Sequence, residues 1–361
     1  STGASTRWAR PLPPGAPLSP HNLPAHIAPF IGRDAELTEL HARLEDPACR
    51  LLTLVGPGGS GKTRLALEVA RTHLAHFPHG IYYVPLVGVP SQEALLPAIA
   101  QAMGFTIQTP GQAARLLSDN LNPKTMLLIL DNFEHLLKGL NVVLEILQAA
   151  PCIKIMVISR VRLNAHGECL FPVDGMRVAE DGRYDLEEAA KSDAVQLFIC
   201  CARRMQAGFS PTEDELAAII HICQLVRGMP LAILLATSWM LVLSPAEIAA
   251  RLADDLASNL DFLRADWGDI PARQRSMRAV FDYSWRTLSI RERAVLQALS
   301  VFRGGFTREA AEQVMGVSLR ELRALVDKSV VQPITPGRAG KRAEKRYEIH
   351  PLMRQYVAQK L

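Results

Sequence analysis

The chain lacks a large net charge and any apolar run of membrane length, and each absence excludes a class of protein. Its 361 residues include 40 Lys and Arg against 36 Asp and Glu, and the net charge of +4 is too small for this size to indicate nucleic acid binding by itself. The strongest apolar run, residues 230–243, is shorter than a membrane span and contains Thr237 and Ser238, so it predicts a buried helix and no membrane partner. A hydrophobic fraction of 48% is typical of a soluble globular protein, and the length allows two or three domains.

The cysteines lack the spacing of a metal site or a redox motif. No two of them read C-x-x-C, and most stand in apolar surroundings: Cys49, Cys152, Cys169, Cys200, Cys201 and Cys223. This usage predicts reduced core residues in a cytoplasmic protein. The chain also opens without a methionine or a signal peptide, and residues 1–22 are rich in Pro, Gly and Ser. We therefore expect a linker at 1–22 and a piece of a larger protein.

What the chain does have is a glycine-rich segment between a strand pattern and a helix pattern. Residues 51–55 are a continuous apolar run, typical of a buried strand, and the apolar positions after Thr63 have helical spacing. Residues 56–63 read G-P-G-G-S-G-K-T and match G-x-x-x-x-G-K-[ST], in which backbone N–H groups converge on a phosphate. Lys62 would reach the β- and γ-phosphates, and the Thr63 hydroxyl would bind Mg²⁺. The alternative, a turn that binds nothing, needs a chance match expected in roughly 1 in 100 chains.

Further strand patterns at residues 81–86, 126–130 and 154–159 alternate with helical patterns, which predicts a parallel, doubly wound sheet. Asp131 directly follows one of them, at the sheet edge that faces the ligand, and is therefore a predicted Mg²⁺ ligand. Asn132 stands where many fast ATPases have a second acid, and an amide cannot accept a proton from water. Glu134 could replace that acid if the backbone brings it round, so we expect slow hydrolysis.

Arg160 follows Ser159 at the end of the strand pattern at 154–159. A guanidinium at this edge suits the oxygens of a γ-phosphate and could report its presence. The alternative for Arg160 is an ordinary ion pair at the surface.

After residue 176 the patterns are helical. Thr212 and Glu215 form a capping box, Ser244 and Glu247 open another helix, and Pro230 starts a helix between them. No catalytic cluster accompanies these helices. We therefore expect a helical lid over residues 176–265.

The last hundred residues predict three short helices and a hairpin. Ser289, Thr307 and Ser318 are the expected helix caps, and the strand patterns at 330–334 and 347–350 flank a turn. This order predicts a winged-helix domain, a fold that often binds DNA through its third helix. Here that helix mixes both signs of charge, while the turn is basic, with Arg338, Lys341, Arg342, Lys345 and Arg346. A charged turn is usually only solvated, so DNA contact is possible but not favoured.

The order of these motifs resembles a known family. The segments "LPAHIAPFIGRDAEL", the phosphate loop, "LLILDNFEHL", "VISR", "GMPLAI", "SVFRGGFTREAAEQV" and "IHPLMRQYV" look like the STAND signal-transduction ATPases. They are similar to the NB-ARC modules of plant immune receptors and of the apoptosome, and closer to those of bacterial multidomain regulators. The resemblance covers residues 23–361.

The resemblance implies roles for residues that match the family's motifs. Residues 30–33 would frame the adenine, Pro230 would close the base pocket, Arg160 would sense the γ-phosphate, and His350 would touch the β-phosphate of ADP. The motif around His350 reads I-H-P, without the family's aspartate. The predicted nucleotide contacts are Phe30, Ile31, Gly32, Arg33, Gly56, Gly58, Gly59, Ser60, Gly61, Lys62, Thr63, Arg64, Pro230, Leu231 and His350. The predicted catalytic residues are Lys62, Asp131 and Arg160, and the predicted metal ligands are Thr63 and Asp131.

We therefore expect an α/β P-loop NTPase domain with a parallel sheet at 23–175, a helical lid at 176–265 and a winged-helix domain at 266–361. The expected function is a nucleotide switch that is off with ADP and on with ATP and Mg²⁺, that hydrolyses ATP slowly, and that oligomerises when on. Its sensor and effector domains would lie outside this chain. A DNA-binding ATPase regulator and a constitutive ATPase are the alternatives, and the residues alone do not separate adenine from guanine.

Overall fold

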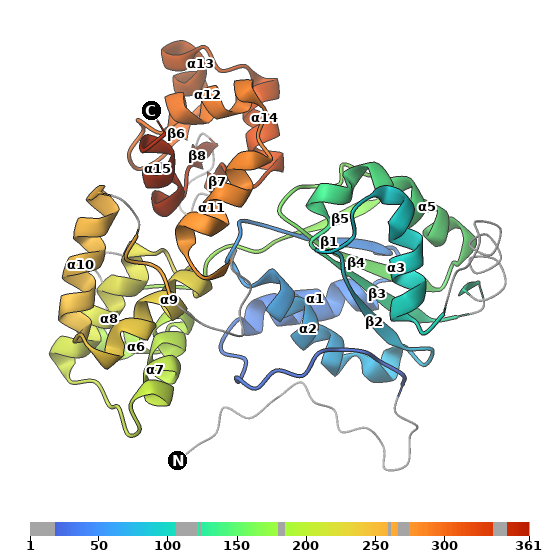
Figure 1. The fold of residues 1–361 in the computed structure, drawn as a ribbon, viewed down its shortest axis with the longest axis horizontal. Helices are drawn as coiled ribbons and strands as arrows, with labels where there is room; N and C mark the ends of the chain where they lie inside the picture. The colour runs from blue at the N-terminus through green and yellow to red at the C-terminus, as the bar shows by residue number, and fades with distance from the viewer. Residues whose placement is uncertain are drawn as a thin grey trace. The chain divides into compact units, whose positions relative to one another are not determined.

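The computed structural model describes residues 19–105, 121–122, 124–179, 185–258, 261–265, 274–334 and 345–360. They form two compact units (Figure 1). The first unit holds the chain up to residue 30, then residues 34–55 and 62–172. The second unit holds residues 31–33, 56–61 and 173–361.

The first unit alternates strands and helices along the chain. Its elements are α1 (Asp34–Glu45), β1 (Leu51–Val55), α2 (Lys62–Thr72), η1 (Leu74–His76), β2 (Ile81–Pro85), η2 (Gln92–Ala94), α3 (Leu95–Ala102), β3 (Met126–Asp131), η4 (Phe133–Gly139), α5 (Leu140–Ala149), β4 (Ile153–Ser159) and β5 (Glu168–Pro172). The strands form one five-stranded sheet in the order β2-β3-β4-β1-β5, and every neighbouring pair is parallel. This confirms the predicted α/β P-loop NTPase core with a parallel sheet.

The strand bounds differ from the prediction in small ways. β2 ends at Pro85, one residue early, while β3 includes Asp131 and β4 begins at Ile153. The fifth strand, β5, was not predicted because "ECLFP" is no continuous apolar run. In the structure this strand is only partly buried. β1 shows the opposite extreme, since all five of its residues are buried.

The second unit is mainly helical, with a small sheet near the end of the chain. Its elements are α6 (Leu186–Ala190), α7 (Asp193–Met205), α8 (Glu213–Leu225), α9 (Pro230–Thr237), η5 (Ser238–Leu241), α10 (Pro245–Ser258), α11 (Met277–Arg286), α12 (Ile290–Leu299), β6 (Phe306–Thr307), α13 (Arg308–Met315), α14 (Leu319–Asp327), β7 (Gln332–Ile334), β8 (Arg346–Glu348) and α15 (Pro351–Ala358). One apolar cluster, from Met176 to Val357, contains residues of the helices of this unit.

The caps predicted for these helices are present. Thr212, Ser289 and Ser318 each begin a helix with a complete capping box. The buried helix predicted in the run 230–243 begins at Pro230 as expected, but α9 ends at Thr237 and a 3-10 turn follows. Within the described residues, no helix has the length and apolar character needed to cross a membrane.

The end of the chain forms a three-stranded antiparallel sheet in the order β6-β8-β7. The strand predicted at 347–350 stops at Glu348, and His350 instead caps the N-terminus of α15. Of the basic turn, Arg338, Lys341 and Arg342 lie outside the described residues. All six cysteines are free thiols. Cys49, Cys201 and Cys223 are buried core residues as predicted, whereas Cys169 and Cys200 are only partly buried and Cys152 is exposed.

Candidate functional site

The glycine-rich segment lies at the strand-to-helix turn that the sequence predicts. β1 ends at Val55, and α2 begins at Lys62, whose side chain is mostly buried. Gly59 and Gly61 have φ values of 85° and 88°, in the left-handed region that residues with a Cβ rarely adopt. A loop of this shape before a helix N-terminus is suited to an anion, because its N–H groups and the helix dipole act together.

The carbonyl groups of this loop have their own donors. The Gly59 carbonyl accepts from the Leu231 N–H at 3.2 Å, and the Ser60 carbonyl accepts from the Arg33 guanidinium at 2.8 Å. The Leu231 N–H belongs to the first turn of α9, where helical N–H groups have no partner in their own helix. The predicted contact residue Leu231 therefore holds the loop through its backbone.

Arg33 also acts on the backbone. It has φ 62°, directly after Gly32 at 65°, and its guanidinium donates to the carbonyls of Ser60 and Asp174, both at 2.8 Å. Its own N–H donates to Asp193 Oδ2 at 3.1 Å. The segment predicted to frame adenine thus uses its arginine to brace the phosphate loop, a role that the sequence pattern does not reveal.

The remaining predicted contacts are less specific. Phe30 and Ile31 are partly buried, and so is Pro230, the first residue of α9. The Arg64 guanidinium donates to the Ala28 carbonyl, so this side chain is engaged with the segment that precedes α1.

Thr63 and Asp131 come together as the predicted metal site requires. The Thr63 hydroxyl donates to Asp131 Oδ1 at 3.0 Å, and the Tyr83 hydroxyl donates to Asp131 Oδ2 at 2.7 Å. Desolvation raises the pKa of Asp131 above its usual value, while the two hydroxyl donors act in the opposite direction. Tyr83 was not singled out from the sequence, because a tyrosine in an apolar strand is usually a packing residue.

The residues at this position fit Mg²⁺. A carboxylate and a hydroxyl oxygen are the hard ligands that this ion prefers. Within the part of the chain that the structure describes, no group of three or more His, Cys, Asp or Glu side chains could hold a metal. Mg²⁺ is usually bound by one or two protein groups together with phosphate oxygens and water, so the pair Thr63 and Asp131 suits a metal that arrives with a nucleotide.

The backbone turns at Asn132 so that Glu134 lies beside Arg160. Asn132 has φ 69° and ψ 49°, a left-handed conformation that asparagine tolerates, and its N–H donates to the Ile158 carbonyl at 3.0 Å. The chain then turns into η4 and buries Glu134, whose Oε1 lies 3.4 Å from Arg160 Nε. Arg160 therefore forms the ion pair that was weighed against phosphate contact, but with a buried acid.

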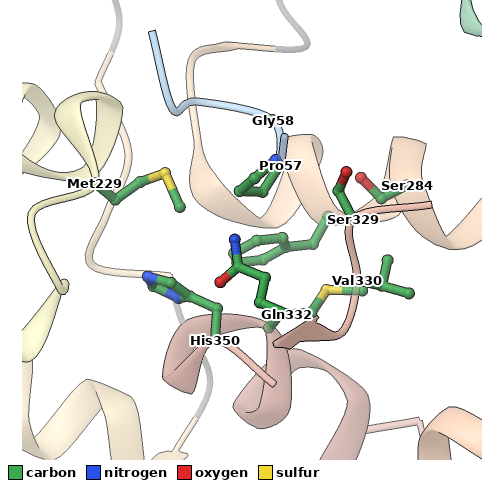
Figure 2. Close-up of a pocket in the computed structure, with 10 residues that line it drawn as sticks. Pro57, Gly58, Met229, Ser284, Ser329, Val330, Gln332 and His350 are labelled. Atoms are coloured by element: carbon green, nitrogen blue, oxygen red, sulfur yellow. The ribbon is translucent and has the colours of Figure 1, made fainter. Parts of the chain in front are cut away.

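His350 lines a pocket within the second unit (Figure 2). The pocket is lined by Pro57, Gly58, Met229, Phe281, Ser284, Ser329, Val330, Gln332, His350 and Met353. Two of these residues, Pro57 and Gly58, belong to the phosphate loop. Figure 2 shows His350 and Gln332 opposite Pro57, with Met229 on one side and Ser284 and Ser329 on the other.

The hydrogen bonds of His350 fix the position of its proton. Nδ1 accepts from the Leu352 N–H at 3.3 Å, so a neutral ring carries its proton on Nε2. Burial lowers the pKa of His350 to about 3, and the charge of Arg227 acts in the same direction. The Val226 carbonyl acts in the opposite direction, but Nε2 has no hydrogen-bond partner among the described residues. The side chain is therefore neutral and buried, and its Nε2 makes no hydrogen bond of normal distance and angle among the described residues.

The charges on α14 are largely paired within the same part of the chain. Arg323 lies 3.6 Å from Asp327, and Glu321 accepts from Arg291 at 2.5 Å, which is the main reason that its pKa falls to about 2. Lys328 donates to Glu292 at 2.7 Å. In the helix that would enter DNA in a winged-helix domain, these charges thus pair with each other or with residues of α12.

The chain is similar to several known proteins. Residues 29–151 match the family described as the AAA ATPase domain. The uncharacterized protein Rv0894 of Mycobacterium tuberculosis is 31% identical over 351 residues, which cover 94% of this chain and 83% of that protein. The regulatory protein AfsR of Streptomyces griseus is 31% identical over 98% of this chain, which corresponds to 35% of AfsR.

Among solved structures, a STAND protein with a tetratricopeptide repeat sensor, PH0952 from Pyrococcus horikoshii, matches 94% of this chain and 43% of its own, with 18% identity and a TM-score of 0.37. The sequence matches carry the assignment, because the similarity to Rv0894 extends along most of both proteins and the AAA ATPase match covers the phosphate loop. The chain therefore belongs to the same protein family as Rv0894, and its residues 29–151 match the AAA ATPase domain family.

Proposed function

We propose that the chain is a nucleotide-dependent switch that bound ADP holds closed and that ATP opens. One observation carries this proposal: His350, whose buried Nε2 makes no hydrogen bond among the described residues, lines a pocket whose wall includes Pro57 and Gly58 of the phosphate loop. A donor without an acceptor is costly in a protein interior, and a phosphate oxygen on the loop would supply one.

In this proposal residues 56–63 bind the phosphates. The backbone N–H groups and Lys62 hold the β-phosphate, and Thr63 and Asp131 hold Mg²⁺, which supplies charge neutralisation at the phosphate oxygens when bound. Arg33 and Leu231 keep the loop in its binding shape, because they occupy the carbonyls that must point away from the anion. The base would be adenine, as in the family.

The closed state would be stabilised by contacts within the second unit. The Arg227 guanidinium pairs with Glu348, and the Gln332 amide donates to Asp174 Oδ1 at 2.5 Å. We interpret residues 176–265 as a helical lid and 266–361 as a winged-helix domain. The Arg227 contact then joins the lid to strand β8, and the Gln332 contact joins strand β7 to the segment just before the lid. Loss of such contacts on exchange of ADP for ATP would free the winged helix and allow oligomerisation.

DNA binding by the winged helix is the weaker proposal, because most charged side chains on and next to α14 form ion pairs within the domain. A DNA complex would show affinity for any duplex that falls steeply as salt rises.

The direct test is to denature the purified protein and identify the released nucleotide by chromatography. We expect ADP in near-stoichiometric amount. A protein that carries no nucleotide and binds no added ADP or ATP would contradict the switch.

Replacing Asp131 with Asn should weaken ATP binding in Mg²⁺ about tenfold while changing ADP binding less. Mg²⁺ held by Thr63 and Asp131 would neutralise phosphate charge, which is greater on ATP than on ADP, so its loss should fall mainly on ATP. Metal-site partners are typically worth about 10–100-fold. Titration of both nucleotides, in Mg²⁺ and in EDTA, checks this. Equal losses in all four titrations would argue against a metal role.

Glu134→Gln should slow ATP hydrolysis by about a hundredfold and leave the ATP dissociation constant within about threefold of wild type. General-base groups contribute about 10²–10⁴-fold to a rate. Glu134 is a buried carboxylate that follows Asp131 closely in the chain, just after the left-handed turn at Asn132. Single-turnover hydrolysis is the measurement, with the exposed Glu145→Gln on α5 as the matched control. Equal rates in both variants would remove Glu134 from the hydrolytic step.

A further inference from the structure

We propose that Tyr83 is a positioning residue for the Mg²⁺ carboxylate of Asp131, and that Asn22, in the segment before α1, sets the position of Tyr83. The inference rests on the proposed binding of Mg²⁺ with a nucleotide. It concerns three side chains of the first unit that are joined by consecutive hydrogen bonds.

The sheet register explains how Tyr83 reaches Asp131. Tyr83 on β2 pairs with Ile129 on β3, and Asp131 is two residues further along β3, on the same face of the sheet. Such diagonal neighbours are within reach of an aromatic side chain. The Tyr83 hydroxyl donates to Oδ2 at 2.7 Å while the Thr63 hydroxyl donates to Oδ1 at 3.0 Å.

These two donors fix the plane of the carboxylate. One comes from the helix that follows the phosphate loop and the other from the neighbouring strand, and each leaves its oxygen a further lone pair for a metal or for metal-bound water. Partners of this kind orient a metal ligand, and their loss is typically costly for metal affinity. Tyr83 therefore limits the directions in which Asp131 can present its oxygens.

Tyr82 provides the contrast within the same strand. It precedes Tyr83, so its side chain lies on the other face of the sheet, where it packs against the apolar cluster of the first unit. Burial raises the pKa of Tyr82, as expected for a ring in that cluster. The same substitution at the two positions thus separates loss of the Asp131 contact from a general effect of removing a tyrosine hydroxyl.

Asn22 holds the backbone of Tyr83 at the edge of the sheet. β2 is an edge strand, and the incoming chain runs beside it, with a parallel bridge between His21 and Ile81. The Asn22 side chain accepts from the Tyr83 N–H at 2.6 Å and donates to the Tyr83 carbonyl at 2.8 Å. It thereby satisfies both backbone groups that Tyr83 presents on its open side.

The consequence is a physical link from the incoming segment to the metal site. A displacement of residues 19–22 from β2 would release Tyr83 and, through its hydroxyl, one oxygen of Asp131. A domain attached before residue 19 could bias Mg²⁺ binding through this link.

The test compares Tyr83→Phe with Tyr82→Phe in nucleotide titrations. The quantity measured is the gain in affinity for a fluorescent ATP analogue when EDTA is replaced by Mg²⁺. Tyr83→Phe should reduce this gain about tenfold and leave the affinity in EDTA unchanged, and Tyr82→Phe should change neither. A Tyr83→Phe gain equal to that of wild type, or larger, would overturn the inference.

Asn22→Ala tests the second half of the link. It should reduce the Mg²⁺-dependent gain in the same direction, and the double variant with Tyr83→Phe should be no worse than Tyr83→Phe alone, because both act through one hydrogen bond. Additive losses would show that Asn22 does not act through Tyr83. If wild type binds no nucleotide, the proposed function itself falls, whereas Mg²⁺-dependent binding that ignores Tyr83 removes only this inference.

Discussion

Replacing Lys62 with Ala is expected to reduce ADP and ATP affinity at least about a hundredfold, which corresponds to about 2.7 kcal/mol. Hydrogen bonds from a charged group contribute about 1.5–3 kcal/mol each. The Lys62 side chain is only 8% exposed at the first position of α2, so its ammonium group would meet the phosphates with little competition from water.

The variant should fold but lose the thermal protection that nucleotide gives. A ligand present at 100 times its dissociation constant stabilises the folded state by about 2.7 kcal/mol, so added ADP should raise the melting temperature of wild type by several degrees and that of Lys62→Ala hardly at all. Lys138→Ala, an exposed lysine on η4, is the matched control. Full nucleotide occupancy in Lys62→Ala would mean that the glycine loop is only a turn.

The sheet was predictable because its signals are local. Continuous apolar runs mark β1 and β3, and the loop motif and Asp131 each follow one of them directly. The strand order β2-β3-β4-β1-β5 was not predictable in the same way, since it depends on pairing between segments far apart in the chain. The same holds for β5, whose sequence carries no strong apolar run.

The parts of the site that the sequence missed, left conditional or assigned another role share a physical cause. Glu134 reaches its buried place only because Asn132 adopts a left-handed conformation, and a sequence does not show which asparagine will do so. Tyr83 reaches Asp131 through the register of two strands, and Arg33 reaches the Ser60 carbonyl from 27 residues away. The sequence itself offers only indirect hints at these contacts: Asn132 directly follows a strand pattern, and Tyr83 lies within another strand pattern.

The I-H-P motif at the end of the chain also gains a structural reason. Pro351 occupies the first position of α15, where its missing N–H costs nothing, and His350 is the residue that caps this helix. Pro351 thus stands at the first helical position, where the motif of the family has an aspartate. His350 can have two tasks in this proposal, since Nδ1 caps the helix while Nε2 is left to donate to a ligand.

Two substitutions separate these tasks. His350→Ala removes both the cap and the Nε2 donor, whereas His350→Asn keeps a side-chain acceptor for the Leu352 N–H but is too short to replace Nε2. Both variants should release ADP faster by about tenfold to a hundredfold, because a hydrogen bond to a phosphate oxygen contributes about 1.5–3 kcal/mol.

The switch should loosen without opening fully. Inverting a two-state equilibrium from 1:99 to 99:1 needs about 5.5 kcal/mol, more than one hydrogen bond supplies, so the other closed-state contacts such as Arg227 with Glu348 should still hold most molecules closed. The measurement is the dissociation rate of a fluorescent ADP analogue from wild type and both variants, with Lys62 intact. Faster release from His350→Ala alone would assign the effect to the helix cap. Unchanged rates in both would mean that His350 does not touch the nucleotide, and the ADP-closed state would have to be abandoned.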